Sequence, residues 1–226
     1  MILALDTSTE MTSVAVYSPQ EGVLAEETWR SHRQQTVQLM PTVQRLMATL
    51  DMPSKAITGV AVATGPGSFS GVRVGISAAK SIAYALEVPL WGVPSLDILA
   101  YAHAAVTAAQ VCAVLDMGRR RYAWALYRTR SAKWSRLTPY QGGTLEELTR
   151  ALQEYESNVA TLVCGEISDE AGKQLRETLG VHIAIAPRAS SVRRAGYLAE
   201  LAAQRDAQGE RDDPATLQAI YLATSG

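Results

Sequence analysis

The first thirty residues contain three short runs rich in apolar residues, with polar turn residues between them. These runs cover residues 2–5, 12–17 and 23–29, and Thr/Ser-rich and Pro-Gln-Glu-Gly turns separate them. Short runs bounded by turn residues are typical of β-strands, so the pattern predicts an antiparallel meander. Over residues 35–50 apolar side chains recur every three or four positions, which predicts an amphipathic helix.

A compact apolar run at residues 59–64 then leads into a glycine-rich turn, and residues 71–86 return to helical periodicity. Residues 90–93 predict a further strand and residues 95–108 a further helix. The first half of the chain is therefore expected to follow the order β-β-β-α-β-α and then to continue with a strand and a helix.

The second half partly repeats this order. Residues 111–115 and 122–127 predict a hairpin that opens a second meander, and residues 144–155 and 169–179 predict two weaker helices. Such a repeat suggests an α/β protein of two lobes related by duplication, with mixed sheets flanked by helices. We expect the lobes to cover residues 1–100 and 101–226, with a helix near residues 191–205 packing back on the first lobe.

Composition narrows the class of protein. The 226 residues are 47% hydrophobic, which is ample for a buried core, and the net charge of −1 gives no overall attraction to nucleic acid. Cys112 and Cys164 lie in separate apolar runs and are expected in the core rather than in a disulfide or a zinc site. The three histidines show no metal-ligand spacing, and no segment predicts a signal peptide or a membrane span. We therefore expect a cytoplasmic protein with no metal site.

Four polar residues follow the first predicted strand, and they are the first candidate ligand site. The hydroxyl and N–H groups of Thr7, Ser8 and Thr9 could face an anion while Asp6 orients a hydrated magnesium ion. The alternative is a turn in which these side chains bond their own backbone and bind no ligand.

The glycine-rich stretch at residues 64–75 is the second candidate. Gly65, Gly67 and Ser68 stand between a predicted strand and the start of a helix, where unpaired N–H groups could bind an anion. The stretch is neither a Walker loop nor a dinucleotide fingerprint, because it lacks Gly-Lys-Ser/Thr and because Ser70 stands in place of the third glycine. A tight connection capped by Ser68 or Ser70 explains the pattern equally well.

The helix after this stretch has a broad apolar side and a narrow opposite stripe of mostly small residues. Together with the preceding helix it could form a helix-on-helix contact with another chain, although burial within its own lobe fits the pattern as well. The candidate interface residues are Val37, Met40, Arg73, Ser77, Lys80, Ser81 and Tyr84.

Three successive arginines, Arg119, Arg120 and Arg121, fall between two predicted strands and are expected at a hairpin tip. Three guanidinium groups could bind phosphates of RNA, and a solvated turn is the alternative.

Residues 1–99 resemble the TsaB family, also called YeaZ. The resemblance rests on Ile-Leu-Ala-Leu-Asp-Thr-Ser-Thr at residues 2–9, Gly-Pro-Gly-Ser-Phe-Ser-Gly-Val-Arg-Val-Gly at residues 65–75, and Gly-Val-Pro-Ser-Leu-Asp at residues 92–97. Beyond these residues it is looser. The family usually has arginine after the C-terminal Tyr-Leu, where this chain has Ala223, which puts the C-terminal contact in doubt.

The resemblance implies a two-lobed actin-like ATPase fold (ASKHA, ribonuclease H-like). It also implies an accessory subunit that supports TsaD, its catalytic relative, in forming threonylcarbamoyladenosine beside the anticodon of tRNA, with the ATPase TsaE completing the complex. Such a subunit pairs through the two first-lobe helices, as a homodimer when alone and as a heterodimer with TsaD. ATP and magnesium are then expected only within the complex, with a weak, vestigial site at residues 6–9, Gly65, Gly67 and Ser68.

The resemblance also implies that no catalytic residue is present. TsaD carries a metal-binding histidine pair shortly after the segment that matches residues 88–93, whereas this chain continues Pro-Ser-Leu-Asp-Ile-Leu. Without metal ligands, the group that would polarise the transferred carbonyl is missing. The alternative class is an enzyme, either a weak ATPase or a peptidase that acts on TsaD.

Overall fold

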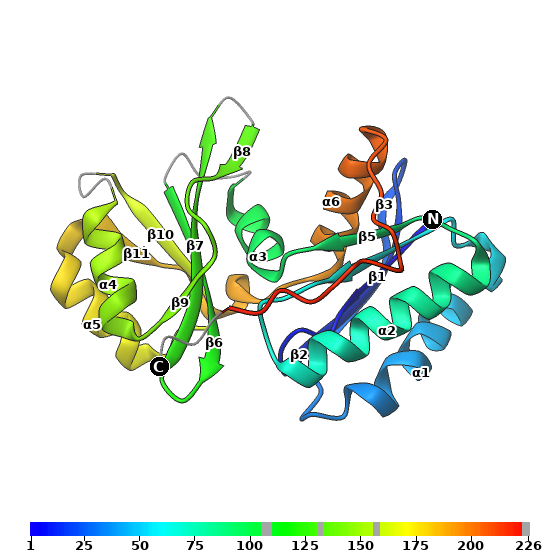
Figure 1. The fold of residues 1–226 in the computed structure, drawn as a ribbon, viewed down its shortest axis with the longest axis horizontal. Helices are drawn as coiled ribbons and strands as arrows, with labels where there is room; N and C mark the ends of the chain where they lie inside the picture. The colour runs from blue at the N-terminus through cyan, green and yellow to red at the C-terminus, as the bar shows by residue number, and fades with distance from the viewer. Residues whose placement is uncertain (105–109, 131–132, 156–158, 223–226) are drawn as a thin grey trace. The chain divides into compact units, whose positions relative to one another are not determined.

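The computed structural model describes residues 1–104, 110–130, 133–155 and 159–222. Within it the chain forms two compact units (Figure 1). Unit 1 consists of Met1–Ile98 and Arg193–Ile220, and unit 2 consists of Leu99–Val192 and the C-terminal residues from Tyr221. No helix of the described residues is long and apolar enough to cross a membrane.

A five-stranded mixed sheet forms the centre of unit 1. Its order is β3-β2-β1-β4-β5, in which β1 pairs antiparallel with β2 and parallel with β4. The strands are β1 (Ile2–Asp6), β2 (Met11–Ser18), β3 (Gly22–Arg30), β4 (Gly59–Ala63) and β5 (Leu90–Val93). Every residue of β1 and β4 is buried, as expected for central strands that are covered on both faces.

Helices cover both faces of this sheet (Figure 1). α1 (Gln35–Thr49) and α2 (Phe69–Leu86) pack on one face and share a core with the strands, which includes Leu5, Val14 and Val62. α6 (Ala195–Ala207) packs on the other face, where the backbone N–H of Ala195 donates to the hydroxyl of Ser13 at 2.9 Å. Successive residues of a strand point to opposite faces, so Ser13 faces α6 and Val14 faces the core under α1 and α2.

Unit 2 repeats the plan with a six-stranded sheet. Its main path is β11-β10-β6-β7-β8, and β9 pairs with β7. The strands are β6 (Gln110–Gly118), β7 (Arg121–Arg130), β8 (Lys133–Arg136), β9 (Gln141–Gly143), β10 (Thr161–Gly165) and β11 (Ile183–Ile185), and the helices are α3 (Ser95–Ala104), α4 (Leu145–Glu154) and α5 (Asp169–Leu179). α3 begins in unit 1, and three short 3-10 turns occupy Ser54–Ala56, Gly180–His182 and Arg188–Ser191.

The two sheets have the same connectivity. In each, a three-stranded antiparallel meander precedes a helix, a strand parallel to the first strand, a second helix and a further parallel strand; unit 2 differs by the short β9 between its meander and α4. The order β3-β2-β1-β4-β5 therefore corresponds to β8-β7-β6-β10-β11. This is the duplication that the repeated pattern predicts.

The predicted elements of the first half lie within a few residues of those observed. α2 begins at Phe69, two residues earlier than predicted, because Ser68 caps it by accepting a hydrogen bond from the N–H of Gly71 at 3.3 Å. Residues 105–108 of the third predicted helix lie outside the described residues. The division into two lobes needs one amendment, since the second lobe is interrupted: the chain returns to unit 1 at Arg193, and only the residues from Tyr221 belong to unit 2 again.

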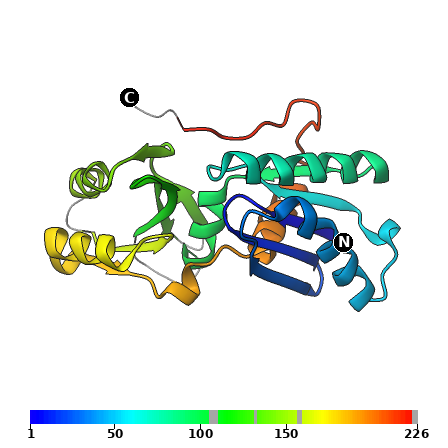
Figure 2. The same ribbon diagram turned by 90° about the horizontal axis from the view of Figure 1, so that it is seen from below.

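The segment after α6 lies along the open edge of β5, and we call residues 208–220 the strap. The N–H of Asp212 donates to the carbonyl of Leu90 at 2.9 Å, and its carboxylate accepts from the N–H of Gly92 at 2.7 Å. Arg205 donates both to the carbonyl of Gly92 and to Asp212, each at 2.9 Å. The strap therefore satisfies edge groups of β5 that would otherwise be open for pairing (Figure 2).

Candidate functional site

Asp6 lies at the carboxyl end of β1, and both of its carboxylate oxygens are engaged. One oxygen accepts from the N–H and the hydroxyl of Ser8, at 2.9 and 2.6 Å. The other accepts from Nε of Arg193 at 3.0 Å, and the same guanidinium donates to Oγ1 of Thr9 at 2.6 Å. The side chains of Asp6 and Arg193 are 0% and 1% exposed, so the charge pair is closed off from water.

The glycine-rich loop packs directly against the turn formed by residues 6–9. The N–H of Ser68 donates to the carbonyl of Ser8 at 2.6 Å, and the hydroxyl of Thr7 donates to the carbonyl of Gly71 at 2.7 Å. A Cβ on Gly67 would lie 2.1 Å from the carbonyl oxygen of Ser8. Glycine is therefore required at this position because the two backbones touch.

The residues that the sequence marks for nucleotide contact are therefore brought together in one place. Their donors, however, mainly bind each other: the N–H groups of Ser8 and Ser68 both have partners within the protein. Ser95 at the start of α3 keeps a buried hydroxyl without a hydrogen-bond partner, although its N–H donates to Gly65. A phosphate bound by these N–H groups, or a magnesium ion at Asp6, would have to displace existing contacts, so the donor set does not fit a nucleotide in this arrangement.

Sequence reasoning missed Arg193, which completes this cluster. The predicted helix near residues 191–205, packed on the first lobe, places the region around Arg193 near that lobe. No local pattern, however, distinguishes Arg193 from the adjacent Arg194. The two differ in the structure, because Arg194 is half exposed and pairs with Glu26 on β3.

The candidate interface residues lie on the outer face of α1 and α2. All seven are at least partly exposed, and the apolar or aromatic members include Tyr84 at 85% and Val37 at 68% exposure. Near the start of both helices there is a hollow of about 350 Å³, lined in part by Met40, Arg73 and Ser77. The guanidinium of Arg73 stacks over the ring of Phe69 at 3.8 Å. The face therefore combines exposed apolar groups, small residues and positive charge.

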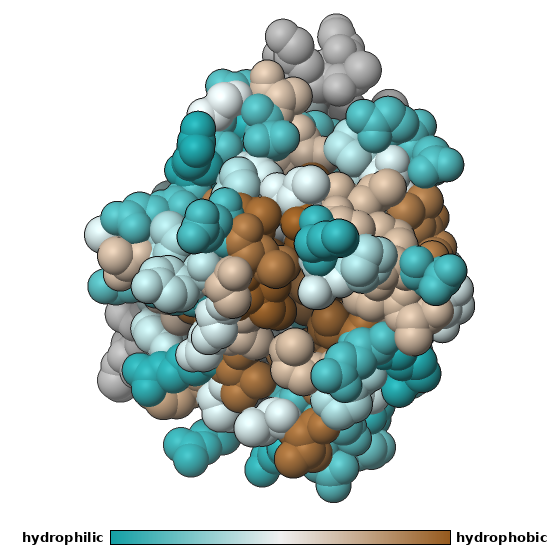
Figure 3. All heavy atoms as spheres, turned by 90° about the vertical axis from the view of Figure 1, so that its right-hand side faces the viewer, coloured by the Kyte–Doolittle hydropathy of each residue, from teal (hydrophilic) through white to brown (hydrophobic). Residues whose placement is uncertain are grey.

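Exposed apolar surface is also visible at the far end of unit 1. Figure 3 shows the side of the molecule on which the C-terminal ends of α1 and α2 lie, and apolar side chains form patches there between polar ones. Half-buried apolar residues of this region that pack on the core include Leu50, Met52, Leu86 and Val88.

The three arginines occur where the sequence places them, at the tip of the β6–β7 hairpin. Arg119 and Arg120 form the two-residue turn, both in the left-handed region, with φ of 54° and 59°, and both are exposed. Two-residue hairpin turns of this kind usually contain Asn-Gly, because the left-handed conformation costs a side chain energy. Backbone strain at an exposed, charged position is a feature that a purely structural turn does not require.

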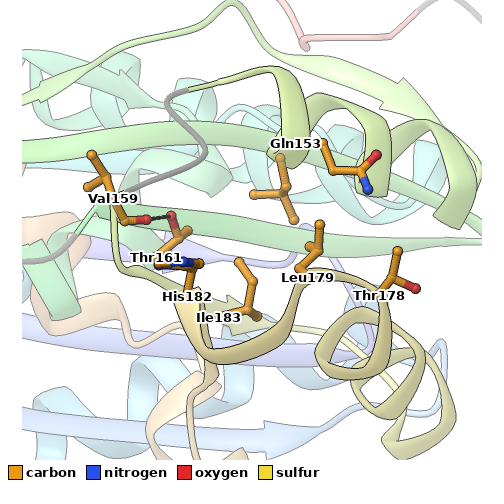
Figure 4. Close-up of a pocket in the computed structure, with 8 residues that line it drawn as sticks. Gln153, Val159, Thr161, Thr178, Leu179, His182 and Ile183 are labelled. Carbon is orange, nitrogen blue, oxygen red and sulfur yellow. Dashed lines mark hydrogen bonds between the residues drawn. The ribbon is translucent and has the colours of Figure 1, made fainter.

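Unit 2 holds a separate small pocket of about 170 Å³ (Figure 4). Leu152, Leu179 and Ile183 supply its apolar wall, and the hydroxyl of Thr161 is turned to the carbonyl of Val159, to which it donates at 3.2 Å. None of the residues predicted for a site lines this pocket.

Cys112 and Cys164 are both fully buried and unbridged, which confirms their predicted place in the core. Burial raises the pKa of both thiols well above the ordinary value, so they remain protonated and unreactive near neutral pH.

Comparisons with known proteins agree with this architecture. The structure resembles that of YeaZ from Pseudomonas aeruginosa with a TM-score of 0.79 at 25% identity, over 98% of this chain and 99% of the other. It shares its fold with the ethanolamine utilization protein EutJ from Carboxydothermus hydrogenoformans, at a TM-score of 0.52 and 12% identity over 88% of each chain. The fold is that of the two-lobed actin-like proteins.

The sequence comparisons identify the family. The model of TsaD, tRNA N6-adenosine threonylcarbamoyltransferase, matches residues 7–155. The protein named tRNA threonylcarbamoyladenosine biosynthesis protein TsaB from Bacillus subtilis is 29% identical over 206 residues, which are 91% of this chain and 88% of that protein. TsaB from Escherichia coli is 35% identical over 128 residues, 56% of this chain and 54% of that protein. The chain belongs to the family that the TsaD model describes and, within it, to the TsaB (YeaZ) group.

Proposed function

We propose that this chain is a non-catalytic subunit in the formation of threonylcarbamoyladenosine in tRNA. It supports TsaD, which transfers the threonylcarbamoyl group to the adenosine beside the anticodon, and it acts in the cytoplasm. The names of its relatives in Bacillus subtilis and Escherichia coli support the pathway. The choice between subunit and enzyme rests on the geometry of this chain.

The observation that carries the proposal is the buried pair of Asp6 and Arg193. A carboxylate that binds magnesium must be able to reach the ion or its water shell. Here its second oxygen accepts from a guanidinium at 3.0 Å, and neither side chain reaches solvent. Arg193 supplies the positive charge that a metal ion would otherwise supply, so the isolated chain binds ATP and magnesium weakly or not at all.

The start of α3 supports the same choice. In TsaD a metal-binding histidine pair is expected shortly after the segment that corresponds to β5, whereas in this chain Leu96, Ile98 and Leu99 follow and are fully buried. These side chains serve the core. These residues include no histidine, so a metal ion that would activate the transferred carbonyl has no histidine ligands at this point of the chain.

The open face of α1 and α2 is the proposed partner surface. It binds TsaD in the working complex, to which TsaE also belongs, and a second copy of this chain when TsaD is missing. Exposed Val37, Met40 and Tyr84 supply apolar area, and the small Ser77 and Ser81 allow close approach of another helix. Arg119, Arg120 and Arg121 are proposed to touch tRNA held by the complex.

Reconstitution tests the proposal. Purified TsaD, TsaE and the enzyme that forms threonylcarbamoyl-adenylate are combined with tRNA, with and without this chain, and light scattering follows complex formation. We expect modification to require the chain and a complex that contains both it and TsaD. The proposal would be wrong if modification proceeds at full rate without the chain. ATP turnover or cleavage of TsaD by the chain alone would instead support an enzyme.

A further inference from the structure

The two helices of the proposed partner surface contain no acidic residue. α1 (Gln35–Thr49) and α2 (Phe69–Leu86) have neither aspartate nor glutamate, but they carry three basic residues, Arg45, Arg73 and Lys80. Surface helices of cytoplasmic proteins ordinarily mix both signs of charge. The chain as a whole has 22 acidic residues and 21 basic ones, so the charge balance of these two helices differs from that of the chain.

The positive charge is concentrated where a partner helix would lie. Arg45 is turned to β3, where it forms two hydrogen bonds of 2.7 Å with Glu27, so its charge is offset within the chain. Arg73 lies over Phe69 at the hollow, and Lys80 lies close to two helical turns further along α2. The first turns of both helices also lack acidic residues, so no negatively charged side chain of either first turn offsets the positive helix end.

The positive charge of this face disfavours its pairing with the same face of a second copy. A symmetric dimer brings the same patch of both copies together, so Arg73 and Lys80 of one copy would meet a patch of the same sign. This inference rests on the proposed function: we propose that the face selects a partner whose facing helices carry carboxylates opposite Arg73 and Lys80. The apolar centre of that partner surface would cover Val37, Met40 and Tyr84. Self-association through this face is the weaker of the two pairings because of its charge.

Ionic strength separates the two pairings. Salt screens repulsion in the self-pair and attraction in the mixed pair, so the two dissociation constants should move in opposite directions. We measure self-association by sedimentation and binding to TsaD from the same source by calorimetry, at about 50 and about 500 mM sodium chloride. Added salt should strengthen the self-pair and weaken the complex with TsaD, each by about tenfold.

Reversing the charge of Lys80 tests the same inference independently of salt. Lys80→Glu should weaken binding to TsaD by about tenfold or more at low salt and should pair with the unmodified chain more tightly than the unmodified chain pairs with itself. The matched control is Lys173→Glu on α5, an exposed helical lysine whose replacement changes net charge equally and should leave both pairings unaltered.

The outcomes distinguish this inference from the proposed function. If TsaD binds with an affinity that changes neither with salt nor with Lys80→Glu, the proposed partner surface stands, but selection of the partner by charge is wrong. Salt that strengthens both pairings would overturn it too. No complex at either salt concentration would overturn the proposed surface together with the inference.

Discussion

Asp6 and Arg193 are 187 positions apart in sequence, and their side chains form an ion pair of 3.0 Å that is closed to solvent. The pair joins the end of the first strand to the point where the chain re-enters unit 1. The pair therefore anchors the returning segment and also neutralises the one carboxylate of the turn formed by residues 6–9.

Removing one partner of this pair should be costly, because the other is left as an uncompensated buried charge. We expect Arg193→Met to lower the free energy of unfolding by about 3–5 kcal/mol, measured by urea denaturation. The neighbouring Arg194→Met should cost only about 1 kcal/mol, since Arg194 is half exposed. Combining Arg193→Met with Asp6→Asn should recover most of the loss. A single-variant loss below about 1 kcal/mol would show that water reaches the pair.

The contact between the glycine loop and the turn formed by residues 6–9 predicts a second sensitive position. In Gly67→Ala the new Cβ would lie 2.1 Å from the carbonyl oxygen of Ser8, so one backbone must move. We expect a loss of about 1–3 kcal/mol in unfolding free energy. Gly172→Ala on α5 is the control: its Cβ would lie 3.6 Å from Ile185, and it should stabilise the chain by roughly 0.5–1 kcal/mol. Equal effects at both positions would contradict the close approach.

The strap predicts a dependence of stability on pH. Burial acts to raise the pKa of Asp212, but hydrogen bonds from Arg205 and Gly92 and the charge of Arg205 outweigh it, so this pKa lies below its ordinary value of 3.8. A lowered folded-state pKa contributes stability that is present above the unfolded value and is lost as the pH falls through the folded value. Asp212→Asn should therefore cost about 1–2 kcal/mol near neutral pH.

This cost should shrink as the pH falls from 3.8 through the lower folded-state pKa, because the carboxylate of the unmodified chain then becomes neutral, like the asparagine that replaces it. Urea denaturation of both proteins over a series of pH values measures the difference. Asp206→Asn, on the last turn of α6, serves as the control. A difference that stays constant down to the acid limit would mean that the charge of Asp212 contributes nothing.

The hairpin arginines allow stability and binding to be separated. Replacing Arg119 and Arg120 by Asn and Gly suits the left-handed turn better and should stabilise the chain by about 1 kcal/mol. If these residues bind phosphates, the same change should weaken tRNA binding by the complex with TsaD by about tenfold at fixed salt, measured by filter binding. Lys173→Asn with Arg176→Asn removes equal charge from α5 and should leave binding unaltered. Unchanged binding in the hairpin variant would exclude the contact.

The sequence predicted the elements of unit 1 well because its helices show a clear helical period and its strands are apolar runs bounded by turn residues. The short strands β8, β9 and β11 have three or four residues each, too few to show a period, and were missed. Arg193 and the strap were missed for another reason: their roles rest on hydrogen bonds to residues far away in the sequence, such as Asp6 and Leu90, and such contacts leave no local pattern. The turn formed by residues 6–9 and the glycine-rich loop lie against each other, but the arginine that pairs with Asp6 and closes it off from solvent could not be identified from the sequence.

The most direct test compares two variants in the reconstituted tRNA modification reaction. Ser77→Arg places a bulky side chain on the proposed partner surface, where it blocks the close approach of another helix, with Ser77→Ala as its control, whereas Asp6→Asn with Arg193→Met removes the buried ion pair. For a supporting subunit, Ser77→Arg should abolish both TsaD binding and the stimulation of modification, and the double variant, once shown to be folded, should keep both. Full stimulation by Ser77→Arg, together with loss of activity in the double variant that still binds TsaD, would contradict the account.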